Sequence, residues 1–164
     1  MPKFVDYDVT GEVTDIMERI AEKFPVVFPS FDVNQVGATM TKGKKARKPA
    51  RLIPVRYPFS VWLASKVYIV EVFYDMWTEM NQKQRNIAVF HVMCAIPEGE
   101  FDTESKDYGR RRVPDYELYH EEFAVSGGHP DWMDNPDDIP DVLDAAMGEN
   151  VDKNPVTADQ IASV

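Results

Sequence analysis

The feature that most constrains the fold is an apolar strand followed within a few residues by an apolar helix. Residues Lys66–Phe73, KVYIVEVF, are β-branched, aromatic and almost uncharged, which predicts a strand. Asn81 is a good helix N-cap, and Gln84, three residues further on, completes a pattern resembling a capping box. The helix that follows carries apolar residues on one face and ends before Pro97. Both elements need a partner layer, so we expect a sheet packed on helices.

Two further helices and a short helical turn are predicted along the chain. Apolar residues at helical spacing predict a helix over Glu12–Phe24, which ends before Pro25. A second helix is expected over about Asp115–Val125. Ser60 is expected to cap the short turn that follows it.

Two other segments have the composition of strands. Val33–Met40 is strand-like, and Gly37 within it predicts a bulge. A basic stretch separates this segment from Leu52–Arg56, so the two segments are candidates to pair across a long loop. The sequence therefore predicts an α+β fold with a small sheet.

Composition excludes several classes of protein. The 164 residues contain a single cysteine, Cys94, so neither an intramolecular disulfide nor an all-cysteine zinc site can form. No apolar run approaches the ~20 residues of a membrane span, and the acidic N-terminus does not resemble a secretion signal. We expect a cytoplasmic protein that makes no membrane contact. The formal net charge of −10 argues against general nucleic-acid binding.

The charge is unevenly distributed along the chain. The segment 42–56 contains bases but no acid, and its candidate binding residues are Lys42, Lys44, Lys45, Arg47, Lys48 and Arg51. The segment 131–152 contains acids but no base, and its candidate binding residues are Asp131, Asp134, Asp137, Asp138 and Asp141. Such runs are most often solvated surface, and the functional alternative is contact with partners of opposite charge.

Two regions follow from this distribution. Residues 1–134 are expected to form one domain with the basic loop at 42–56. Residues 135–164 are acidic and proline-dotted, which predicts a flexible tail with at most one short helix near Asp141–Met147.

The order of elements resembles the phage metallopeptidase family, a group of small zincin-like proteins, over roughly Phe24–Trp132. In that family a buried strand precedes a helix that carries an HExxH motif, and a second helix opens with Asp and ends at Gly and then Trp. The matching residues here are Gln84, Arg85 and His91 in the first helix and Asp115, Tyr119, Gly127 and Trp132 in the second. The resemblance implies a zincin-like α+β fold, a viral origin and action in the host cytoplasm.

The most specific motif of that family is degenerate in this chain. HExxH places two zinc ligands on one helix face, with a Glu as the general base beside the first. Here His91 occupies the first ligand position, but Val92 replaces the general base and Ala95 replaces the second ligand. Valine accepts no proton and alanine binds no metal. The resemblance therefore implies no catalytic residue and no cofactor.

Three functions fit these residues. The first is a phage-encoded pseudoenzyme that binds, or inhibits, a host protein. The second is a zinc metallopeptidase with an altered site, in which His91 is joined by Cys94 or His120. The third is an acidic decoy that imitates nucleic acid. The sequence favours the first, because the general base is missing in the second and the net charge permits the third without requiring it.

Overall fold

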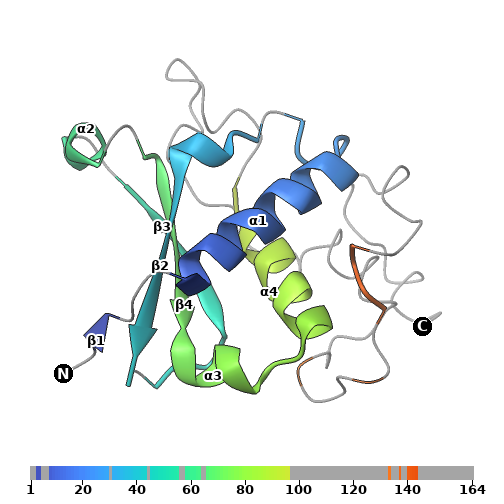
Figure 1. The fold of residues 1–164 in the computed structure, drawn as a ribbon. Coiled ribbons are helices and arrows are strands. Elements are labelled where there is room, and N and C mark those ends of the chain that lie inside the picture. Colours follow the sequence, from blue (N-terminus) through green and yellow to red (C-terminus); the bar gives the residue numbers. More distant parts are fainter. Residues whose placement is uncertain are drawn as a thin grey trace, which may run out of the picture.

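The computed structural model of the protein describes residues 3–4, 8–29, 31–43, 45–55, 58–63, 66–96, 133, 137 and 140–143. Within these residues the fold is α+β, with one mixed sheet and helices packed against it (Figure 1). The strands are β1 (Lys3–Phe4), β2 (Val36–Lys42), β3 (Ala50–Pro54) and β4 (Tyr68–Phe73). The helices are α1 (Asp8–Lys23), η1 (Val33–Gln35), α2 (Phe59–Trp62), α3 (Tyr74–Glu79) and α4 (Gln82–Cys94).

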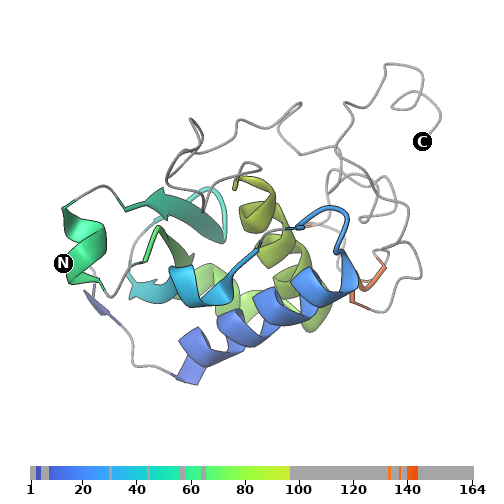
Figure 2. The same cartoon turned by 90° about the horizontal axis from the view of Figure 1, so that it is seen from above.

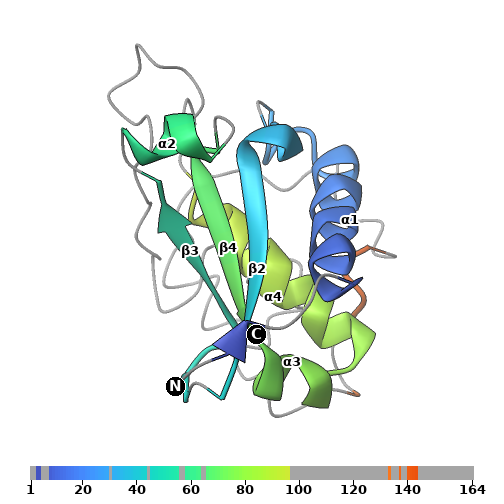
Figure 3. The same cartoon turned by 60° about the vertical axis from the view of Figure 1, so that its left-hand side comes forward.

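The strand order is β1-β2-β4-β3, so β4, the most apolar strand, lies between β2 and β3 (Figure 3). β4 runs parallel to β2 and antiparallel to β3. The expected pairing of the two segments that flank the basic stretch is therefore wrong, because β4 separates them. The expected bulge is also absent, since Gly37 pairs in register with Ile69. A strand that is apolar on both faces is most stable at the centre of a sheet, where both of its edges are paired.

One face of the sheet packs on α1 and α4, which lie side by side (Figures 1 and 2). Alternate residues of β4, namely Tyr68, Val70 and Val72, are completely buried there. The helices meet through aromatic side chains, and the rings of Phe24 and Phe90 pack edge to face with centroids 5.2 Å apart. β4 and α4, the strand and helix that most constrain the fold, therefore form the centre of the core.

Several element boundaries differ from those that the sequence predicts. The first helix begins at Asp8, one turn before Glu12. Ser60 lies inside α2 instead of capping it, and Pro58 takes the cap position without a side-chain hydrogen bond. Helix α3 was not predicted: the chain turns directly from β4 into it. The expected helix over Asp115–Val125 lies outside the described residues.

Part of the segment expected as a flexible tail is packed on the core. The side chain of Val142 is completely buried. The Lys23 ammonium donates a hydrogen bond to the Leu143 carbonyl. Just before the predicted tail, the Met133 carbonyl accepts from the Gln84 side-chain amide at 2.8 Å. Residues 140–143 thus belong to the folded unit. None of the described helices is long and apolar enough to cross a membrane.

Candidate functional site

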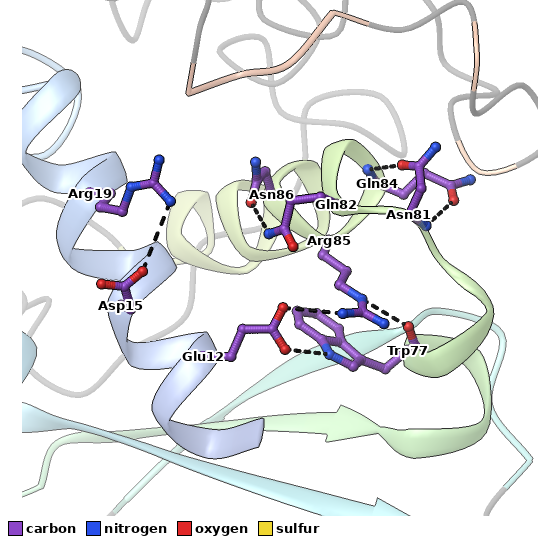
Figure 4. Close-up of polar contacts among 9 residues, drawn as sticks. All are labelled: Glu12, Asp15, Arg19, Trp77, Asn81, Gln82, Gln84, Arg85 and Asn86. Carbon is purple, nitrogen blue, oxygen red and sulfur yellow. Dashed lines mark hydrogen bonds and ion pairs between the residues drawn. The ribbon is translucent and has the colours of Figure 1, made fainter. Parts of the chain in front are cut away.

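Helix α4 and its C-cap carry His91, Val92 and Ala95, the residues that the sequence resemblance sets against HExxH, and the helix N-terminus is held by the capping box that the sequence predicts. The Asn81 side chain accepts a hydrogen bond from the Gln84 N–H at 2.9 Å, and the Gln84 side chain accepts one from the Asn81 N–H at 3.0 Å (Figure 4). These two bonds satisfy backbone donors that a helix start otherwise leaves unpaired.

A half-buried polar clamp joins α4 to α1 and α3. Glu12 of α1 accepts from the Arg85 guanidinium at 3.2 Å and from the Trp77 indole N–H at 3.4 Å (Figure 4). The same guanidinium donates to the Trp77 carbonyl at 3.1 Å and lies 5.4 Å from the centre of its indole ring. The sequence shows no sign of this clamp, because its members are far apart along the chain. It fixes the orientation of the helix that carries the motif.

The motif itself is packed into the interior. Val92 and Ala95, at the two degenerate positions, are 2% and 6% exposed, and Cys94 is buried. His91 is half-buried, and it is the least buried residue in the second half of a helix that is otherwise enclosed. The sequence predicts apolar residues on one face of this helix. The structure instead buries nearly the whole circumference of α4 after its first turn.

The described residues contain no group of three or more His, Cys, Asp and Glu side chains arranged to hold a metal ion. His120 lies outside those residues. The altered zinc site on His91, with Cys94 or His120, therefore stays a prediction.

The first part of the basic segment, from Lys42 to the start of β3, lies at the end of the sheet beside α3, and the rest of the segment runs along β3 (Figure 1). Lys44 and Arg56 fall outside the described residues. The other five predicted binding residues are exposed: Lys42, Lys45, Arg47, Lys48 and Arg51. Two of them have local roles, because the Lys42 ammonium lies 4.9 Å from the centre of the Tyr74 ring and Arg51 forms an ion pair with Glu71. Of the five exposed residues, Arg51 is the one that an acidic partner partly neutralises among the described residues.

Glu71 is a buried carboxylate in the middle of β4, and its functional potential was missed. One of its oxygens accepts from the Thr41 hydroxyl at 2.8 Å, and the other accepts from the Arg51 guanidinium. The three side chains come from three adjacent strands and lie on the face opposite α1 and α4. An acid within the otherwise apolar KVYIVEVF was the signal that could have found it, because a buried carboxylate needs such partners. Its oxygens hold the sheet together.

The acidic segment is only partly described. Asp137 is exposed, whereas Asp141 accepts hydrogen bonds from the Asn86 side chain at 2.9 Å and from the Leu143 N–H at 3.0 Å. Asp141 was predicted as a binding residue, but its carboxylate anchors residues 140–143 to α4. Asp131, Asp134 and Asp138 lie outside the described residues.

Large apolar side chains are exposed on α2, at the opposite end of the sheet from α3 (Figure 1). Phe59, Trp62 and Leu63 are 66%, 84% and 44% exposed. The Leu63 N–H donates to the Phe59 carbonyl at 3.0 Å, so the three residues share one helical turn. We call these residues the α2 patch. Sequence reasoning missed it, because apolar residues in a short turn normally predict burial.

Comparisons with family models, with curated proteins and with solved structures gave no match to this chain.

Proposed function

We propose that this chain is a non-catalytic binding protein, a phage-encoded relative of the metallopeptidases that acts on a host protein in the host cytoplasm. The loss of catalysis follows from residue chemistry. Val92 and Ala95 provide neither a base nor a ligand, and both are enclosed by the core. Because the helix that carries these residues is buried, we expect the protein to act through contacts made by its surface.

The observation that carries the binding function is the α2 patch. Trp62 is 84% exposed, so folding leaves unused most of the free energy that burying its side chain would provide. Phe59, Trp62 and Leu63 stand at i, i+3 and i+4, the spacing at which helical side chains form one surface. Aromatic anchors of this kind dominate the binding energy of many protein interfaces. The patch fits a partner protein that offers an apolar pocket.

A tryptophan substitution tests this function. Tagged wild-type protein is incubated with bacterial host lysate, captured partners are identified by mass spectrometry, and affinity is measured with the purified partner. Trp62→Ala should weaken that binding at least about 30-fold, since interface anchors contribute about 2 kcal/mol or more. The melting temperature should stay unchanged, because the side chain is exposed.

Val26→Ala is the matched control. Val26 is 55% exposed but lies in the turn after α1, away from the α2 patch. It should bind like the wild type. Equal affinity of Trp62→Ala and wild type would exclude the α2 patch as the contact surface.

A further inference from the structure

A groove of about 520 Å³ lies between α1 and the start of β2. Its α1 wall includes Asp15 and Glu18, and its opposite wall includes Asn34, Gly37 and Ala38. It shares no residue with the α2 patch, although the backbone N–H of its lining residue Lys66 donates to the Leu63 carbonyl at 3.1 Å. It borders a sheet edge, which is a natural place for an extended chain to bind.

The hydrogen-bonding direction of this edge follows from the pairing of β4. The Phe73 N–H donates to the Pro49 carbonyl, so in the antiparallel register with β3 the odd-numbered residues of β4 face β3. Val67, just before β4, bonds to both sides: its carbonyl accepts from Val55 and its N–H donates to the Gln35 carbonyl. The even-numbered residues therefore face β2. In the observed register this pattern directs the backbone groups of Val36, Ala38 and Met40 away from β4, toward the outer edge.

The same edge already pairs with a strand at its other end. Phe4 pairs with Thr41 and Lys3 with Lys42, in an antiparallel arrangement. Among the described residues no strand continues this pairing along Val36–Met40. The Val36 N–H is used by the Val33 carbonyl, so the Val36 carbonyl and both backbone groups of Ala38 form the edge within the groove.

The charged side chains around the groove indicate what it accepts. The carboxylates of Asp15 and Glu18 are exposed on its α1 wall. Asp15 has only a loose, exposed contact of 3.9 Å with Arg19. The one basic residue among the described lining residues, Lys66, already donates its ammonium to the Asn34 carbonyl. The accessible charge on the α1 wall is therefore negative.

We propose that this groove binds an extended protein segment that adds to the Val36–Ala38 edge and carries a Lys or Arg side chain within reach of Asp15 and Glu18. The backbone of the segment would bond to the edge, as in other cases of strand addition. The acidic wall would select its side chains. This site does not depend on the α2 patch.

The experiment uses the full-length, isotope-labelled protein and a synthetic peptide, Thr-Val-Lys-Val-Thr-Val-Lys-Thr, titrated to about 1 mM, the range of weak peptide affinities. Amide shifts of Gly37 and Ala38 in two-dimensional NMR report binding at the edge. The Lys peptide should shift them saturably, and the same peptide with Glu in place of both Lys should bind about fivefold more weakly or worse. No shift at these amides, or equal binding of both peptides, would overturn the proposal.

Two substitutions separate backbone from charge recognition. Ala38→Pro removes an outward-facing N–H, a change that edge strands tolerate, and should weaken peptide binding about fivefold. Glu18→Lys should weaken it by a similar factor. Glu22→Lys is its matched control, because Glu22 is exposed on the same helix but does not line the groove. If Glu18→Lys and Glu22→Lys bind the Lys peptide equally, the acidic wall has no role and the proposal fails, even where Ala38→Pro does not fold.

Discussion

Single residues decide what the motif helix can do. The imidazole of His91 could bind a metal ion, while the side chains of Val92 and Ala95 can neither bind a metal nor accept a proton. Glu71 shows the opposite case. It is a chemically capable residue, but Thr41 and Arg51 occupy its oxygens, so its role is to connect three strands. In each case the neighbours of a side chain set its chemistry.

The first prediction concerns His91. Purified wild-type protein should contain well under one zinc per chain, and His91→Ala should not change that content, because tight zinc sites need three or more ligands. Elemental mass spectrometry of both proteins provides the measurement. One equivalent of zinc in the wild type, together with peptidase activity that a chelator abolishes, would contradict it and favour the metallopeptidase alternative.

At the scale of elements, local signals and long-range packing contribute differently. Helix α4 begins where its cap predicts, but its burial on nearly all sides results from α1, β3 and residues 140–143 closing around it. Helix α3 escaped prediction because it has only six residues and no side-chain cap. Capped and periodic elements are thus predictable, and short uncapped ones are not.

The second prediction concerns the cap of α4. Asn81→Ala should lower the free energy of unfolding by about 1 kcal/mol, the usual cost of losing an N-cap side chain. Urea denaturation monitored by circular dichroism measures it. Glu79→Ala, at the exposed last position of α3, two residues before Asn81, serves as the control and should change stability by less than about 0.5 kcal/mol. A loss no greater than that of the control would show that the capping box contributes nothing.

At the scale of the whole molecule, the C-terminal part completes the core. Residues 140–143 lie far from α1 and α4 in the sequence, yet Val142 is fully buried and Asp141 bonds to Asn86. In contrast, the α2 patch and the acidic groove are surfaces that remain exposed after folding. The residues that close the core are therefore separate from the surfaces proposed for binding.

The third prediction tests this closure. Val142→Ala removes buried methyl groups and should destabilise the protein by about 1–2 kcal/mol, at about 0.8 kcal/mol for each. Asp137→Ala, at an exposed position nearby, should have almost no effect. Thermal unfolding of the two variants beside the wild type provides the comparison. Identical melting temperatures for Val142→Ala and wild type would show that residues 140–143 do not belong to the cooperative core.

The sequence by itself determined the strand β4, the helix α1 and the capped start of α4. Each depends on contacts between residues a few positions apart, whether by side-chain periodicity or by a cap. The α+β class follows from the same local patterns. The sequence also shows directly that positions 92 and 95 hold valine and alanine, whose side chains can neither bind a metal nor accept a proton.

Only the tertiary structure decided the rest. The position of β4 between β2 and β3, the clamp of Glu12, Arg85 and Trp77, and the partners of Glu71 all join residues distant along the chain. The exposure of Trp62 and the open edge beside Ala38 were also decided by how segments pack in three dimensions. Strand pairing and burial depend on which surfaces meet in space, and a one-dimensional pattern of residue types does not specify that choice.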